Sequence, residues 1–272
     1  MWGAGVLFYC VIVKAVLQFT VMEEEIDIKK VARQHLEMDK FFTGDFAVGA
    51  ASGRAESADL QCEPQASQAE DSETVMEMER IAGQVRKCRR CQLGSLRTNA
   101  VPGEGSACAR IAFVGEAPGA DEDAQGRPFV GRAGKLLDKI IAAMGLKREE
   151  VFIGNILKCR PPENRDPRPE EVIKCLPFLQ EQLDVMKPDI IVALGAHAAR
   201  TLLDTNKSIG QLRGKFHDYY PGAMAKPIKL MATYHPAYLL RSYLPENRKR
   251  VWEDMQQVLT ELGLPIPEHE RK

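Results

Sequence analysis

The stretch Gly115–Gly134, GEAPGADEDAQGRPFVGRAG, combines residue types that could bind and act on a small ligand. It holds several acids, among them Glu116 and Glu122, one aromatic side chain at Phe129, and glycines that let a backbone come close to a ligand. An apolar run at 111–114 precedes it and helical spacing follows, so it joins a strand to a helix, where open α/β sheets bind ligands. We therefore place a candidate active site here, with an ordinary long connection as the alternative.

Four of the seven cysteines have a spacing that suits metal coordination. Cys88 and Cys91 form a C-x2-C pair among basic residues, and Cys159 and Cys175 come later in the chain. Four thiolates could hold a tetrahedral zinc ion or a four-iron cluster. The second pair is split by 15 residues, which fits a zinc ribbon less well. Four unrelated buried thiols are the alternative.

The elements that must position these residues alternate along the second part of the chain. Buried strands are predicted from four apolar runs rich in β-branched residues, at 111–114, 151–157, 190–194 and 228–232. Helices are predicted from apolar periodicity at 75–85, 133–144, 169–186, 196–203 and 247–262. Strands and helices that alternate in this way indicate an α/β fold with a parallel sheet covered on both faces.

Charge and composition divide the chain. Residues 1–79 carry a net charge of −9 and residues 80–272 a net charge of +8, so the second part has the potential expected of a polyanion binder. Residues 43–74 are rich in small and acidic residues and are predicted to be a flexible linker. We expect an N-terminal extension over 1–74, one α/β domain over 75–264 and a tail over 265–272.

The apolar stretch Met1–Val21 admits three interpretations. Lys14 leaves only about 12 apolar or small residues before it, whereas a helix that spans a membrane needs about 20. The stretch also lacks the basic start of a signal peptide. A dispensable extension, or a true start at Met22 or Met38, is favoured over a membrane anchor. The sequence therefore predicts no membrane partner and a cytoplasmic location.

Five motifs occur in one order along the chain: KCRRCQL (87–93), GEAPGADED with GRPFVGRAG, GNILKCRPPENRDP (154–167), Cys175, and YHPAYLLR (234–241). Together they resemble the family 4 uracil-DNA glycosylases, the iron–sulfur type, over roughly residues 75–264. The resemblance implies a three-layer α/β/α sandwich around a four-stranded parallel sheet. It also implies a structural [4Fe-4S] cluster on Cys88, Cys91, Cys159 and Cys175.

The activity implied by this resemblance is base excision repair. Such an enzyme flips uracil out of single- or double-stranded DNA, hydrolyses its N-glycosidic bond and leaves an abasic site. A related class captures DNA covalently through a histidine in a KRRIH loop after the second strand. The corresponding stretch here, CRPPENRDPRPEEV, contains no histidine, which argues for turnover.

Three residues of these motifs have side chains suited to uracil. Phe129 can give the base a flat face, and the amide of Asn155 matches uracil N3–H and O4. His235 could donate to O2 while the base leaves as an anion. His197 and His217 are interpreted as structural.

The acids of the same motifs are the candidates for ordering the attacking water and for stabilising the sugar cation. Glu116 could order the attacking water or stabilise the sugar cation. Glu122 and Asn164 are the rivals for this role, and Ala117 is expected to line the uracil pocket beside Glu116.

Contacts with DNA are predicted at the rim. Leu239, Leu240 or Arg241 could fill the place of the flipped base, and Arg132 could bind DNA. Further phosphate contacts are predicted for Arg127, Arg160, Arg165 and Arg168.

The partner is uracil-containing DNA, without a nucleotide cofactor, and the protein is expected to be a monomer. Two other functions remain open: a non-catalytic iron–sulfur DNA-binding relative of the same fold, and a zinc or redox protein that uses the Cys88–Cys91 pair.

Overall fold

A computed structural model of the chain describes residues 68–220, 226–242 and 244–267. The predictions for residues 1–67, including the apolar start and most of the linker, lie outside the described residues. The first described helix, α3 (Gln68–Lys87), begins seven residues before residue 75. The end of the predicted linker is therefore helical, while the domain boundary itself stays a prediction.

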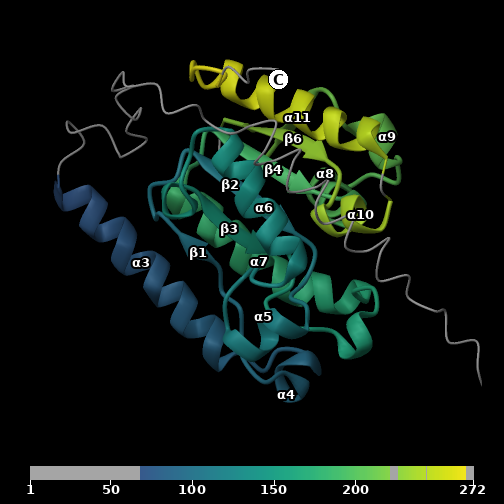
Figure 1. Cartoon of the computed structure of the whole chain (residues 1–272). Helices are drawn as coiled ribbons and strands as arrows, with labels where there is room; N and C mark the ends of the chain where they lie inside the picture. The colour runs from purple at the N-terminus through teal and green to yellow at the C-terminus, as the bar shows by residue number, and fades with distance from the viewer. Residues whose placement is uncertain (1–67, 221–225, 243, 268–272) are drawn as a thin grey trace, which may run out of the picture. The chain divides into compact units, whose positions relative to one another are not determined.

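One mixed sheet of six strands, in the order β1-β3-β2-β4-β6-β5, forms the centre of the domain (Figure 1). Its strands are β1 (Glu104–Gly105), β2 (Ile111–Gly115), β3 (Phe152–Asn155), β4 (Ile190–Leu194), β5 (Phe216–Tyr219) and β6 (Ile228–Thr233). The four inner strands are parallel and lie at the four predicted apolar runs.

The prediction of a four-stranded parallel sheet is wrong at the two edges. Strands β1 and β5 pair antiparallel with β3 and β6. They are two and four residues long, with the sequences EG and FHDY. Short polar strands are typical of sheet edges, and they lack the apolar run by which a buried strand is recognised.

Nine α-helices and two 3₁₀ turns are assigned in the described ranges. Besides α3, the helices are α4 (Leu93–Leu96), α5 (Ala120–Gln125), α6 (Arg132–Ala143), α7 (Pro169–Met186), α8 (Ala196–Leu203), α9 (Ile209–Leu212), α10 (Pro236–Arg241) and α11 (Pro245–Glu261). The turns are η2 (Arg148–Glu150) and η3 (Pro162–Asn164). The predicted bounds of α7 and α8 are confirmed, and those of α6 and α11 differ by one or two residues.

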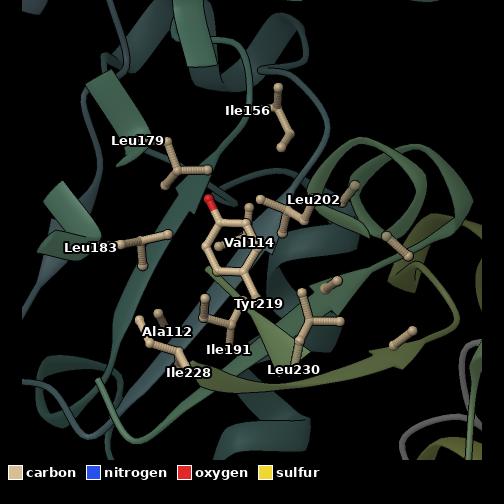
Figure 2. Close-up of a cluster of buried hydrophobic side chains, with 14 of the residues drawn as sticks. Ala112, Val114, Ile156, Leu179, Leu183, Ile191, Leu202, Tyr219, Ile228 and Leu230 are labelled. Atoms are coloured by element: carbon tan, nitrogen blue, oxygen red, sulfur yellow. The ribbon is translucent and has the colours of Figure 1, made fainter. Parts of the chain in front are cut away.

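Helices cover both faces of the sheet. Figure 2 shows Leu179 and Leu183 of α7 and Leu202 of α8 around Val114 and Ile191 of the inner strands. Alternate residues of the same strands point to the other face, where α6 and α11 bury their own apolar sides. The three-layer α/β/α arrangement is therefore confirmed (Figure 1).

The carboxyl ends of the four parallel strands meet at one edge of the sheet. Gly115 at the end of β2 is the register partner of Asn155 at the end of β3. Leu194 of β4 pairs in the same way with Thr233 of β6, and His235 follows two residues later. Parallel pairing thus gathers residues from four distant parts of the chain.

None of the helices within the described ranges is long and apolar enough to cross a membrane.

Candidate active site

A cavity of about 700 Å³ opens at this edge of the sheet. All the residues predicted from the motifs to bind or act on substrate line it, namely Glu116, Ala117, Glu122, Phe129, Asn155, Asn164 and His235. A volume of this size suits a small ligand such as a nucleobase with its sugar.

The side chain of Asn155 has an unsatisfied polar atom in the cavity wall. The residue is only 1% exposed, and its Oδ1 has no hydrogen-bond partner. Gly115 leaves the space beside it, since a Cβ there would lie 2.4 Å from Asn155 Oδ1 and 2.6 Å from Phe129 Cζ. An unpaired buried acceptor costs about 1–3 kcal/mol. A ligand N–H in the cavity could satisfy this acceptor.

Phe129 is held in an uncommon backbone conformation. Its φ is 50°, the left-handed region that bulky residues rarely adopt. Arg148 fixes the segment from behind, because it donates to the carbonyl oxygens of Pro128 and Phe129 at 2.5 and 3.3 Å. Gly134 allows close packing, since a Cβ there would lie 1.9 Å from Phe129 O. The buried ring lies 5.7 Å from that of His235, between centroids.

Glu122 has a different environment from a free catalytic acid. Its Oε2 accepts from the backbone N–H of Gly119 at 3.0 Å, and its Oε1 accepts from those of Val130 and Gly131, both at 2.9 Å. Both oxygens thus hold the backbone at the start of α5 and before α6. The carboxylate shapes the loop that carries Phe129.

The hydrogen bond that His235 makes shows which of its two ring nitrogens carries the proton. His235 Nδ1 accepts from Ala237 N at 3.0 Å and caps helix α10. Burial, together with the charge of Arg241, lowers the pKa of His235 to about 4. The ring is therefore neutral near pH 7, and its proton is on Nε2. A neutral imidazole N–H in the cavity wall can donate to an oxygen that gains negative charge.

Glu116, Asp166 and His197 form a cluster in the lining of the cavity. One ligand atom from each lies within 4.8 Å of the others, and His197 Nε2 is 3.8 Å from Asp166 Oδ1. Burial raises the pKa of Glu116, the charge of Asp166 raises it further, and His197 opposes both. These three side chains could share a metal ion, although Asp166 and His197 are exposed and exposed acidic groups commonly lie together without one.

Sequence reasoning missed the place of His197. The signal that could have found it is topological: His197 follows β4 by three residues, just as His235 follows β6 by two. Residues directly after a parallel strand lie at the ligand-binding edge of the sheet. The interpretation of His197 as a structural residue does not fit its place in the cavity wall.

The rim residues are partly engaged within the protein. Arg127 is paired with Glu104 at 2.6 Å, and Arg165 with Glu171 at 2.6 Å. Asn164 accepts from Arg160 Nε at 2.8 Å. Ion pairs with carboxylates make the first two arginines weaker candidates for phosphate contacts.

The segment after His235 is a short helix, α10, rather than the expected loop. Leu239 faces the core and is 1% exposed, so it does not fit the role of a wedge between bases. Leu240 is half-buried, whereas Arg241 is exposed and lines the cavity. Arg132 is exposed at the first position of α6. Tyr238, for which no role was predicted, is 37% exposed and also lines the cavity.

The four predicted cysteine ligands gather at a second place in the fold. Cys88, Cys91, Cys159 and Cys175 line one small apolar cavity. Two sulfurs accept from well-placed donors: Cys159 Sγ from Arg97 Nη1 at 2.9 Å, and Cys175 Sγ from Lys158 N at 3.2 Å. Hydrogen bonds of this kind stabilise thiolates that bind a metal.

Comparison with known proteins gives a consistent set of relatives. The Uracil DNA glycosylase superfamily matches residues 102–256, which include the whole lining of the cavity. The type-4 uracil-DNA glycosylase of Saccharolobus solfataricus is 48% identical over 183 residues, which cover 65% of this chain and 83% of that protein. The type-4 enzyme of Thermotoga maritima is 48% identical over 181 residues, or 66% and 92% of the two chains. A type-5 uracil-DNA glycosylase of Pyrobaculum aerophilum is 33% identical over 170 residues, or 57% and 73%.

Proposed function

The chain belongs to the uracil-DNA glycosylase superfamily, and we propose that it removes uracil from DNA with the cavity residues described above. It is a uracil-DNA glycosylase, an enzyme that hydrolyses the N-glycosidic bond and leaves an abasic site. The observation that carries the assignment of the cavity is the buried, unpaired Oδ1 of Asn155 beside Phe129 and the neutral His235.

Recognition of the base uses Phe129 and Asn155. The flipped uracil stacks on the Phe129 ring, while Asn155 Oδ1 accepts from N3–H and Nδ2 donates to O4. Cytosine has no proton on N3 and carries a donor at position 4, so both hydrogen bonds would be replaced by clashes of like groups. Unpaired buried groups cost about 1–3 kcal/mol each, which is the source of discrimination.

Bond cleavage places charge on the base and on the sugar. The C1′–N1 bond breaks, its electron pair goes to the uracil ring, and His235 Nε2–H donates to O2 as this oxygen gains charge. The sugar becomes an oxocarbenium-like cation near the Glu116 carboxylate. The oxygen of a water attacks C1′, and Glu116 accepts a proton from that water.

The roles of Glu116 and Glu122 are separable by one matched pair of variants. Glu116→Gln is expected to lower kcat for uracil excision by about 10²–10⁴-fold, the range for a general base. Its raised pKa predicts a wild-type activity that is present above this pKa and lost as the pH falls through it, with a midpoint above the usual 4.5. The variant should lose this acid limb.

Glu122→Gln is expected to lower the melting temperature instead, because three backbone N–H groups would lose a charged acceptor. Thermal unfolding and pH–rate profiles of both variants make the measurement. A wild-type acid limb that persists in Glu116→Gln and disappears in Glu122→Gln would assign the water to Glu122.

The activity itself is tested with a uracil-containing oligonucleotide, single-stranded or paired with guanine, followed by alkali. Strand breaks at the uracil position are expected, with none at cytosine or thymine. Binding without any break would instead support a non-catalytic DNA-binding relative.

A [4Fe-4S] cluster on the four cysteines is part of the proposal, and their arrangement fits it. The four cysteines line one small cavity, and four thiolates are the ligand set of such a cluster. When bound, such a cluster would link α3, the segment after β3, and α7.

Cys88→Ser tests this part of the proposal. The variant should lose visible absorption, and its melting temperature should fall by about 10 °C, which corresponds to roughly 3 kcal/mol in a domain of this size. Cys108→Ser is the matched control, since Cys108 is not in the group, and it should keep both properties. A colourless Cys88→Ser protein with unchanged stability and activity would contradict a structural cluster.

Uracil-containing DNA is the partner in this proposal, and a monomer in the cytoplasm its working form. The support for the DNA partner is the similarity to curated proteins named type-4 uracil-DNA glycosylases. Catalysis by hydrolysis requires no nucleotide cofactor.

A further inference from the structure

Tyr234 and Tyr238 form a pair of tilted aromatic rings in the cavity wall that the mechanism does not use. Their ring centroids are 5.2 Å apart and the ring planes differ by 37°. Both residues line the cavity, and Tyr238 remains 37% exposed. A large aromatic ring held partly in solvent beside a binding cavity is a surface on which a flat ligand can stack.

The inner ring of the pair is fixed by cations. The guanidinium of Arg213 lies 5.6 Å from the Tyr234 ring centroid, and Arg250 Nη1 lies 3.4 Å from its hydroxyl. Arg213 is itself held by the buried carboxylate of Asp254 at 2.8 Å. Asn247 Nδ2 reaches the hydroxyl of Tyr238 at 3.5 Å. A platform ordered in advance loses little conformational entropy when a ligand binds.

The position of Tyr238 relates the pair to the DNA strand. Its backbone N–H donates to His235 O at 2.9 Å, so Tyr238 lies in the same helical turn as the residue assigned to uracil O2. A strand whose uridine enters the cavity comes close to the residues that line it, and these include His235 and Tyr238 of this turn. Arg241 is exposed on the same helix, and Arg250 is exposed on α11, which places cations for the phosphates nearby.

We propose that Tyr238, backed by Tyr234, forms a stacking subsite for the nucleobase next to the flipped uracil. This inference rests on the proposed function. It adds Tyr238 to the residues that contact bases, whereas Leu239, one of the three residues predicted to fill the place of the flipped base, is buried in the core. The ligand is one unpaired or unstacked base of the strand, of any sequence, because every base offers a flat π-face.

The experiment measures stacking directly, without turnover. The probe is a single-stranded oligonucleotide with 2′-fluoro-2′-deoxyuridine, whose glycosidic bond resists cleavage, and with fluorescent 2-aminopurine on the 5′ or the 3′ side of it. The wild-type protein should quench the fluorescence at one of the two positions. Tyr238→Ala and Tyr238→Leu should lose the quenching and weaken binding by about 5- to 150-fold, the range for one base–aromatic stack. Tyr238→Phe should retain both.

Kinetics separate stacking from a merely structural role. With cleavable DNA, Tyr238→Ala should raise KM far more than it lowers kcat, whereas Tyr238→Phe, which keeps the ring and loses only the contact of the hydroxyl with Asn247, should change both much less. Tyr220→Ala is the matched control. Tyr220 is 57% exposed, but it follows the antiparallel strand β5 and therefore lies at the end of the sheet where the parallel strand β6 begins, away from the carboxyl ends that form the cavity. If Tyr238→Ala proves unstable in thermal unfolding, the comparison of the Tyr238→Leu and Tyr238→Phe variants decides between stacking and a structural role.

Two results overturn the subsite: wild-type protein that excises uracil but quenches at neither position, or Tyr238→Leu protein that quenches and binds as the wild type does. Quenching that depends on Tyr238 in a protein that excises no uracil would leave the subsite standing and contradict the proposed function.

Discussion

Replacement of His235 by alanine is expected to lower kcat for uracil excision about 10²–10³-fold, the usual cost of removing one donor to a developing oxyanion. The loss should be the same at every pH from 6 to 9. The pKa of His235 is lowered to about 4, so its neutral form, which donates through Nε2, predominates throughout this range. Single-turnover rates across the range make the measurement.

Loss of the helix cap is a second effect of that change, since His235 Nδ1 accepts from Ala237 N. His235→Asn separates the two, because asparagine is a good N-cap residue but its amide is too short to reach the base. This variant should keep the melting temperature of the wild type and still lose activity. A wild-type rate that rises as the pH falls through 6.5, and no longer does so in either variant, would show instead that a charged imidazole acts.

The inner part of the fold could be predicted because burial leaves a pattern in the sequence. Strands β2, β3, β4 and β6 are largely buried on both faces, so they appear as mainly apolar runs, interrupted in β6 by the exposed Lys229. Helix α7 has a proline at its first position and acids in its first turn, and its bounds followed from these signals. The edge strands β1 and β5 carry no such pattern, because one side of each faces solvent.

The candidate site could likewise be predicted only in part. Residue types and motif order predicted that Phe129, Asn155 and His235 act together, and the parallel register places all three in one cavity. The direction of a side chain within a short helix is a different matter. Successive residues of α10 point about 100° apart, which buries Leu239 and exposes Tyr238. Only the packing of α10 decides which of the two faces DNA.

The hydrogen bonds that one side chain makes to several backbone groups are equally hard to predict from sequence. Glu122 was a rival for the water because its residue type permits it. Its oxygens accept from three backbone N–H groups whose convergence depends on the fold of the whole loop. No spacing in the sequence indicates this.

Asn155→Asp should change the base that the site prefers, with almost no change in side-chain volume. The new carboxyl has no N–H for uracil O4, and we expect kcat/KM for uracil to fall about 10³-fold or more, as in sites built to hydrogen-bond their substrate. In its protonated form the carboxyl can donate to cytosine N3 and accept from the cytosine amino group. The preference for uracil over cytosine should therefore narrow sharply.

The measurement is excision from matched oligonucleotides that differ only in uracil or cytosine at one position, over a range of pH. Asn155→Ala is the control: it removes both hydrogen bonds and should lose uracil excision without any gain for cytosine. Visible absorption should be retained in both variants, since Asn155 lies apart from the cysteines that line the second cavity. Uracil excision by Asn155→Asp at the wild-type rate would mean that the orphaned Oδ1 faces something other than the base. The discrimination would then have to come from the shape of the Phe129 loop, because no other amide in the cavity wall is buried as deeply among the described residues.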